Sequence, residues 1–231
     1  MTGPLAALPR ALVFDLDGTL IDSRLDIACA ANHALGVLGF AQREVAVIAG
    51  YVGDGARPLL ARAAEIAETD PRIDGLYDAF IAYYLVHPID HTTLLPGVAS
   101  ALSALRELPL CVCTNKPRSS TDAVLAQLPL PVRFQLVVAS DDLPKKKPDP
   151  LPLVHIAERL GLTPRELVMV GDGPQDIQCA RAAGARSVGV EGIQPRARLL
   201  AAEPDVVLAS LHELPALIQK WLTPSARDTR R

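Results

Sequence analysis

The sequence is poor in the features that mark membrane proteins, secreted proteins and nucleic-acid-binding proteins. No apolar run approaches the roughly 20 residues that cross a bilayer, and the first ten residues lack the basic start and long apolar stretch of a signal peptide. The 23 basic and 26 acidic side chains leave a net charge of −3, which provides no basic excess for binding nucleic acid. We therefore expect a cytoplasmic protein that binds neither membranes nor nucleic acid.

Cysteine and lysine are also scarce. The four cysteines, Cys29, Cys111, Cys113 and Cys179, show no spacing typical of a disulfide framework or a zinc site. Cys111 and Cys113 alternate within an apolar segment, so we expect two buried, reduced thiols on one face of one strand. Lysine is absent from residues 1–115, so any chemistry in the first half of the chain must do without a lysine amine.

What is present describes a globular protein with a substantial core. Of the 231 residues, 49% are hydrophobic and 21% are charged. This length fits one large domain, or a core domain with a smaller one.

Two aspartates directly follow the first apolar segment. Residues 11–14 predict a short buried strand, which ends at Asp15, Leu16, Asp17 and Gly18. Asp15 and Asp17 would point the same way on an extended backbone and repel each other, so we expect a hard divalent cation such as Mg²⁺ nearby. The same string also occurs in calcium loops and ordinary turns, and the later motifs must decide between these interpretations.

The segment 23–91 predicts helices and no convincing strand. Apolar residues recur at helical spacing after a cap at Asp22 or Ser23, and further helical segments are expected at 44–48, 56–68 and 72–86. We interpret the four tyrosines, all in this segment, as helix packing. An all-helical insertion is therefore expected between the first strand and the rest of the chain.

From Pro96 onward strands and helices alternate, which predicts a parallel sheet. The expected strands are 110–113, 136–139, 167–170, 187–190 and 206–208, and the expected helices are 97–107, 119–127, a helix ending near 160, one through Ile177 and Ala183, 196–201 and a last helix ending at Trp221. Residues 223–231 are expected to fray. We expect an α/β core domain of residues 1–22 and 92–231, with a cap domain of residues 23–91.

Polar residues follow four of the predicted strands. Because the carboxyl ends of parallel strands share one edge of a sheet, these residues should converge there. They are Asp15 and Asp17, Thr114 and Asn115, Lys147, and Asp172 and Asp176. Such a set holds a nucleophile, hydrogen-bond donors, a cation and metal ligands, which is what phosphoryl transfer requires.

These motifs resemble those of the haloacid dehalogenase superfamily. The matching residues are Asp15-Leu16-Asp17-Gly18-Thr19, Thr114, Lys147, and Gly171-Asp172 with Asp176. They span most of the chain in the expected order. The resemblance implies a Rossmann-like parallel sheet with a small helical cap inserted after the first motif.

The resemblance also implies a role for each residue. Asp15 would attack phosphorus and form an aspartyl-phosphate, while Asp17 would protonate the leaving oxygen and then activate water. The carboxylates of Asp15 and Asp172 and the backbone carbonyl of Asp17 would hold Mg²⁺, with Asp176 steadying its waters. Thr114, the backbone amide of Asn115, and Lys147 would hold the phosphoryl oxygens. Lys145 and Lys146 are expected to be solvated neighbours.

Three finer matches resemble bacterial phosphoglycolate phosphatases: residues 52–56, 114–117 and 147–153. The resemblance implies that the substrate is a small phosphorylated metabolite, 2-phosphoglycolate. We expect a monomer or a homodimer. We expect the loop of Gly53, Asp54 and Gly55 to line the substrate pocket, with Arg57 or Arg24 as the cation for the carboxylate. Gly173 departs from the family, which often has Ser at that position, so this chain lacks the hydroxyl that such a serine would supply.

The second acid and the missing lysines separate related chemistries. Dehalogenases of the superfamily lack an acid at the position of Asp17, and phosphonate-cleaving members need a lysine in the cap, which this sequence does not have. Another small phosphate ester as substrate, or a phosphosugar mutase with the same motifs, remains an alternative. A non-catalytic binding protein on this fold is a remote one, because no essential acid or lysine is missing.

Overall fold

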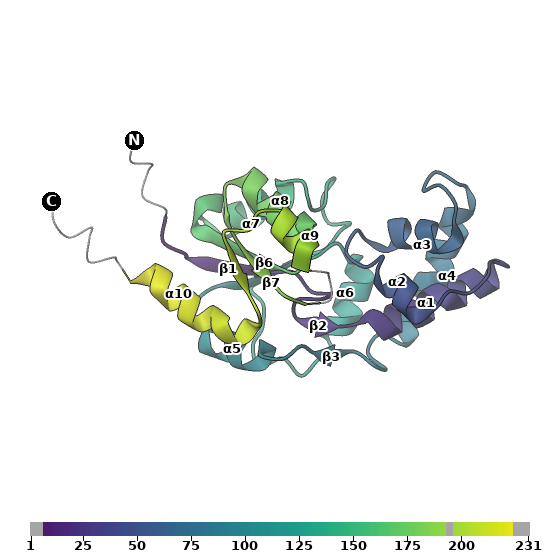
Figure 1. Ribbon diagram of the computed structural model, residues 1–231, viewed down its shortest axis with the longest axis horizontal. Coiled ribbons are helices and arrows are strands. Elements are labelled where there is room, and N and C mark those ends of the chain that lie inside the picture. Colours follow the sequence, from purple (N-terminus) through teal and green to yellow (C-terminus); the bar gives the residue numbers. More distant parts are fainter. Residues whose placement is uncertain (1–6, 193–195, 224–231) are drawn as a thin grey trace.

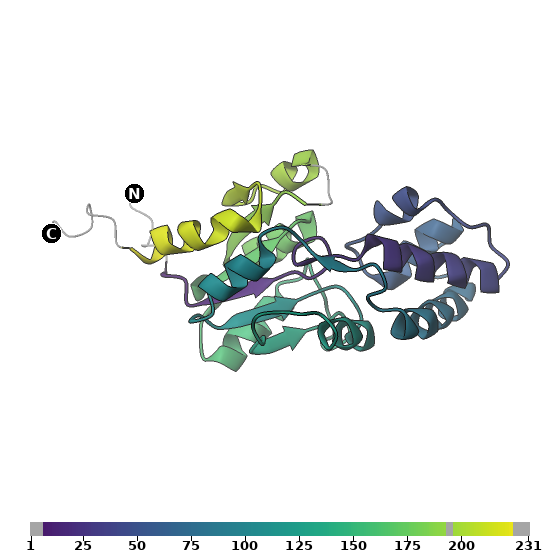
Figure 2. The ribbon, with the colours of Figure 1, turned by 90° about the horizontal axis from the view of Figure 1, so that it is seen from below.

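A computed structural model describes residues 7–192 and 196–223. Most of the expected lead-in and all but one residue of the expected frayed tail, Thr223, lie outside these ranges. The described chain forms two lobes, an α/β core and a group of helices set to one side (Figures 1 and 2). None of the helices in the described ranges is long and apolar enough to cross a membrane.

The core is built on a parallel six-stranded sheet, as the alternation of strands and helices predicts. Its order is β5-β4-β1-β6-β7-β8. The strands are β1 (Ala11–Phe14), β4 (Leu110–Cys113), β5 (Leu136–Val138), β6 (Leu167–Gly171), β7 (Arg186–Val190) and β8 (Val206–Leu208). From β1 the chain moves outward to one side through β4 and β5, and then returns to place β6 on the other side of β1. The strand order therefore reverses between β1 and β6, which is where open α/β sheets bind ligands.

Helices cover both faces of the sheet because the strands are apolar on both (Figure 1). Leu12 and Phe14 belong to the same hydrophobic cluster as residues of α5 (Val98–Ala104) and α10 (Leu214–Leu222). Val13, Cys111 and Cys113 belong to the cluster on the opposite face, with α7 (Leu151–Leu160) and α8 (Pro174–Ala183). The expectation that Cys111 and Cys113 lie free on one face of a strand is confirmed.

The remaining core elements lie around this sandwich. They are α6 (Arg118–Leu125), α9 (Arg196–Ala201) and two short 3₁₀ helices, η1 (Pro164–Glu166) and η2 (Leu211–Glu213).

The second lobe consists of α1 (Arg24–Val37), α2 (Val45–Ala49), α3 (Ala56–Ala64) and α4 (Arg72–Val86). Buried alanines at positions 28, 30, 31 and 34 line α1, and such small side chains allow α4 to approach closely. Tyr84 is fully buried and stacks on Phe80, with 5.7 Å between the ring centroids. Packing of Tyr84 in the helical lobe agrees with the interpretation made from the sequence.

Two crossings connect the lobes, and their structure was not predicted from the sequence. The strands β2 (Ile21–Asp22) and β3 (Thr93–Leu94) form a two-stranded antiparallel sheet at this point. The buried carboxylate of Asp26 accepts hydrogen bonds from the backbone N–H of His91 and the hydroxyl of Thr92 (2.7 Å). The crossings thus flank the segment 23–91, whose extent as a cap domain stays a prediction.

Candidate active site

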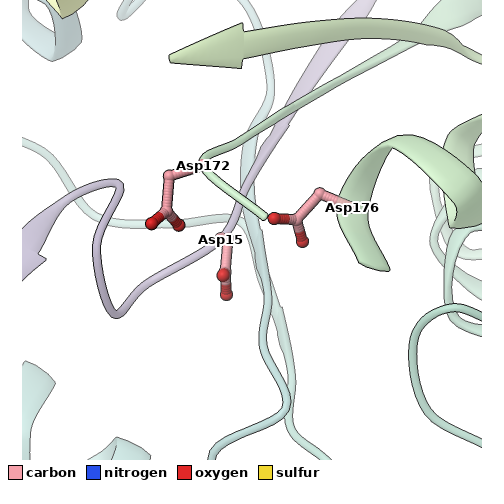
Figure 3. A group of neighbouring side chains, drawn as sticks. All are labelled: Asp15, Asp172 and Asp176. Atoms are coloured by element: carbon pink, nitrogen blue, oxygen red, sulfur yellow. The ribbon is translucent and has the colours of Figure 1, made fainter. Parts of the chain in front are cut away.

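Three carboxylates gather where the strand order reverses. Asp15 follows β1, Asp172 follows β6, and Asp176 lies in the first turn of α8. They are buried, and one carboxylate oxygen from each lies within 4.8 Å of the others. Figure 3 shows the three side chains around one common space. Oxygen ligands at this spacing suit a hard divalent cation.

Glycines make room for these carboxylates. A Cβ atom on Gly18 would lie 2.4 Å from an oxygen of Asp172, and Gly18 has a φ of +91°, which disfavours other residues. A Cβ atom on Gly171 would lie 2.3 Å from an oxygen of Asp176. The glycines of both motifs are therefore required by the close packing of acidic side chains around the site.

Lys147 is the cation among these acids. Its side chain is buried, with Nζ 2.9 Å from Asp15 Oδ1 and 2.6 Å from Asp176 Oδ1. Burial alone would lower the pKa of Lys147, but the charges of Asp15 and Asp176 raise it above its usual range. The two carboxylates therefore favour the charged form of Lys147.

One lysine does not balance three buried acids. Burial raises the pKa of Asp15 to about 7, against the opposing effect of Lys147 and with a further rise from Asp176. Burial and the charges of Asp15 and Asp176 also raise the pKa of Asp172 well above its usual range. The donor set, the burial and the surplus of negative charge all fit a bound divalent cation.

Asp17 lies outside this group of three. Its carboxylate accepts hydrogen bonds from Lys116 Nζ (3.0 Å and 3.2 Å) and from the Ser23 hydroxyl (2.5 Å). Asp15 and Asp17 therefore each face a lysine of their own. The separation agrees with a role in which Asp17 offers only its backbone carbonyl to a metal.

Lys116 is the main residue of the site to which the sequence assigned no role. It is 7% exposed, and its Nζ lies 4.4 Å from the centre of the Tyr84 ring. Burial alone would lower the pKa of Lys116, but the charges of Asp17 and Tyr84 raise it above its usual range. A lysine two residues after Thr114, at the end of an apolar strand, was the available signal.

Thr114 and Asn115 follow β4 and are both buried. Thr114 Oγ1 accepts a hydrogen bond from the backbone N–H of Lys116 (3.1 Å). Asn115 Nδ2 donates to the backbone carbonyls of Lys147 and Gly53, each at 3.0 Å. The side chain of Asn115 therefore connects the strand-end loops of the core to the helical lobe.

The loop 53–55 lies against the core, and a second core lysine holds it. Lys146 Nζ donates to the backbone carbonyl of Asp54 (2.6 Å), and Lys146 is partly buried. The expectation that Lys146 is a solvated neighbour is therefore wrong, because the helical lobe covers it. Lys145 is exposed and pairs with Asp149 at 3.0 Å, as a surface lysine would.

The expected cap cations have partners elsewhere. Arg57 Nη1 lies 2.7 Å from Asp74 Oδ1, and its guanidinium sits over the Tyr77 ring. Arg24 pairs with Asp22 at 2.6 Å, and the Asp54 carboxylate pairs with Arg62. The structure thus brings the loop 53–55 to the site, while these arginines are each paired with an aspartate.

A cavity of about 40 Å³ lies between the two lobes at this point. It holds no more than a few water molecules, so the site suits a small ligand. The core lines it with Asp15, Asp17, Thr114, Asn115, Lys116, Pro117 and Ser120. The helical lobe lines it with Ile27, Val52, Gly53, Gly55, Ala56, Leu59 and Phe80. Asp15, Asp17, Thr114 and Asn115 therefore face one space.

The chain is similar in sequence to known hydrolases. A family model described as haloacid dehalogenase-like hydrolase matches residues 12–190. A phosphoglycolate phosphatase of Chromobacterium violaceum is 43% identical over 187 residues, which cover 78% of this chain and 84% of that protein. A phosphoglycolate phosphatase of Neisseria meningitidis is 40% identical over 215 residues, which cover 89% of this chain and 92% of that protein.

Solved structures share the fold of this chain. A predicted phosphoglycolate phosphatase from Haemophilus somnus superposes with a TM-score of 0.82 at 27% identity, covering 90% of this chain and 97% of that chain. A predicted phosphatase from Clostridium acetobutylicum has the same fold, with a TM-score of 0.83 at 22% identity, covering 93% and 100%. The chain belongs to the haloacid dehalogenase-like hydrolase family, as a phosphoric monoester hydrolase similar to the phosphoglycolate phosphatases.

Proposed function

We propose that the enzyme hydrolyses 2-phosphoglycolate to glycolate and phosphate through an aspartyl-phosphate on Asp15, with Mg²⁺ as its cofactor. The observation that carries the proposal is that two acids with different surroundings, Asp15 and Asp17, line one small cavity. Asp15 lies beside Lys147 and the other acids, and Asp17 lies apart from them with a different set of partners. The curated relatives named above support the substrate.

Asp15, Asp172 and the backbone carbonyl of Asp17 would hold the metal, and Asp176 would orient its waters. When bound, Mg²⁺ supplies positive charge that offsets the negative charge of the phosphoryl group and the surrounding carboxylates. Lys147 lies 2.9 Å from Asp15 and would hold a phosphoryl oxygen next to the attacking carboxylate. Thr114 and the backbone N–H of Asn115 would hold the others.

The residues then divide the reaction into two displacements. The Asp15 carboxylate attacks phosphorus as the ester bond breaks, and Asp17 gives its proton to the departing glycolate oxygen. Asp17, now a carboxylate, takes a proton from a water molecule that attacks the phosphorus of the aspartyl-phosphate. The bond to Asp15 breaks, inorganic phosphate leaves, and Asp17 has regained its proton.

In this proposal the segment 23–91 acts as a cap. The hydrogen bonds from Asn115 and Lys146 to the loop 53–55 support closure of the helical lobe on the core. A closed cap would exclude bulk water from the aspartyl-phosphate until glycolate has left.

Phosphate release with Mg²⁺ across a panel of esters tests the proposal. The panel contains 2-phosphoglycolate, hexose phosphates, nucleoside monophosphates and other small esters, compared by kcat/KM. We expect 2-phosphoglycolate to lead by about 100-fold, which corresponds to roughly 2.7 kcal/mol of transition-state preference. A flat profile would leave the phosphatase chemistry in place and remove the substrate.

A further inference from the structure

The cavity has a polar side and an apolar side, and the proposed substrate carries a charge at each end. Side chains from the helical lobe that line the cavity are uncharged in the described part of the chain. The two arginines expected to receive a carboxylate do not line it. The charged side chains that line the cavity therefore all come from the core.

Two core residues that the mechanism leaves unused line the same cavity, Lys116 and Ser120. Lys116 brings a buried positive charge to within 3.0 Å of Asp17 Oδ1. Ser120 is 1% exposed, and its Oγ makes no hydrogen bond to any residue that the structure describes. Buried hydroxyls are normally satisfied, so an unpartnered one at a cavity wall points to a ligand.

The backbone at the start of α6 also favours an anion, as the charge of Lys116 does. Ser120 lies in the first turn of α6, where backbone N–H groups have no partner within the helix. The N–H of Arg118 is used by Asp141, at 2.7 Å. The other N–H groups of the first turn and the helix dipole add to the charge of Lys116 and the hydroxyl of Ser120.

The position of Lys116 next to Asp17 sets the length of the ligand that fits. In 2-phosphoglycolate a single methylene separates the ester oxygen from the carboxylate carbon. Asp17 is placed to serve that ester oxygen, and Lys116 touches Asp17. A carboxylate one carbon from the reacting oxygen is therefore within reach of Lys116.

We propose that Lys116 and Ser120, at the start of α6, form the subsite that binds the carboxylate of the substrate. This inference rests on the proposed function, and it deepens it by naming a substrate class: phosphate esters with a carboxylate on the carbon that bears the ester oxygen. Esters with a longer spacer or an uncharged end lack this contact.

The test compares two substrates that differ only at this end, 2-phosphoglycolate and 2-hydroxyethyl phosphate. Ser120→Ala removes the hydroxyl, and Ser119→Ala, an exposed neighbour on the same helix, is the matched control. We expect Ser120→Ala to lower the ratio of the two kcat/KM values about 10-fold, the usual scale for losing a hydrogen bond to a charged group. Ser119→Ala should leave this ratio within about 2-fold, since exposed substitutions have small effects.

Lys116→Met extends the test with a larger change. It should lower activity on both esters, because Lys116 also touches Asp17, but activity on 2-phosphoglycolate should fall further. A ratio of the two kcat/KM values that is unchanged in both Ser120→Ala and Lys116→Met would overturn the subsite. This includes equal losses on the two esters, which would mean that these side chains serve only the fold or Asp17.

Inhibition by glycolate separates this proposal from the proposed function. Hydrolysis of p-nitrophenyl phosphate is measured with added glycolate, using wild type, Ser120→Ala and Ser119→Ala. A rise of the inhibition constant confined to Ser120→Ala supports the subsite even if 2-phosphoglycolate proves a poor substrate. A preference for 2-phosphoglycolate in the wild type, with glycolate inhibiting all three proteins equally, would keep the proposed function and discard the subsite.

Discussion

The two sides of the cavity are built in different ways. The core side consists of charged and polar side chains at strand ends, and its acids and lysines are paired within the core. The side formed by the helical lobe consists of apolar side chains and a glycine loop whose backbone carbonyls bond to Asn115 and Lys146. Charge fixed on a rigid sheet suits the chemical step, while an apolar lobe held through its backbone can close without adding charge.

Among substitutions on the core side, Asp15→Asn should cause the largest loss of activity. The amide cannot attack phosphorus, so we expect kcat to fall by at least ~10⁴-fold, as for the loss of other nucleophiles. Lys147 keeps its contact with Asp176, and the buried charge of Asp15 disappears. The midpoint of thermal unfolding without metal should therefore not decrease at about pH 8, where Asp15 would be ionised.

Asp78→Asn, on an exposed position of α4, is the control for this variant. It should retain wild-type turnover. Turnover by Asp15→Asn above a few per cent of wild type, with freshly purified protein, would remove Asp15 from the role of nucleophile.

The neighbouring lysines give the next largest contrast. Lys147→Met leaves Asp15 and Asp176 buried without their cation, so we expect kcat/KM to fall about 10³-fold and unfolding to become easier by about 3 kcal/mol. Lys145→Met, at an exposed surface pair, should change the free energy of unfolding by less than about 1 kcal/mol. Urea unfolding and phosphate release measure both quantities, and similar losses in the two variants would contradict the assignment.

Affinity for Mg²⁺ should depend on pH through Asp15. The pKa of Asp15 in the folded protein is about 7, above its ordinary value of 3.8. The protonated carboxyl therefore stabilises the fold fully below about pH 4, and this contribution is lost as the pH rises through about 7. The metal favours the charged form and must displace the proton at lower pH. We expect the apparent affinity to rise up to about 10-fold between pH 6 and pH 7 and to level off above, measured by calorimetry. An affinity that does not change over this range would mean that Asp15 is already ionised.

The same contrast explains what could be predicted from the sequence. Asp15, Thr114, Lys147 and Asp172 each follow a strand or precede a helix in a recognisable local pattern, and parallel strands bring such ends together. Confirmed elements such as β1 and β4 are short apolar runs with clear ends. These features depend on neighbours in the sequence.

The missed contacts depend on residues far apart. Lys116 and Asp17 are separated by 99 positions, and Asp26 and Thr92 by 66. A lysine in a turn and an aspartate in the first turn of a helix look like ordinary surface residues until the strands are placed side by side. Lys146 is a similar case, since only the position of the loop 53–55 makes it a partly buried donor.

On the side of the helical lobe, Lys146→Met should have a moderate effect. It removes the hydrogen bond to the carbonyl of Asp54, and with it one of the contacts that hold the loop 53–55. We expect KM to rise about 5-fold with kcat within about 2-fold, because a partly exposed charged hydrogen bond is lost and the core side is unchanged. A fall in kcat of the size expected for Lys147→Met would instead place Lys146 in the chemical step.

Gly173→Ser tests a place where a core side chain of the last motif lies close to the loop 53–55, and its effect should be the smallest. A Cβ atom on Gly173 would lie 2.2 Å from Gln175 Nε2, and one on Gly53 would lie 3.0 Å from the same atom. Gln175 thus fills the space that a serine side chain would take, and the φ of −111° at Gly173 allows a serine. We expect the substitution to turn Gln175 away and to lower kcat/KM by no more than about 3-fold, because only a flexible side chain has to move.

Gln175→Ala should produce the same change, and the double variant should add nothing to it, since both substitutions remove one contact. Additive losses in this cycle would mean that Gly173 acts through its own backbone, where its N–H donates to Asp176 at 3.0 Å.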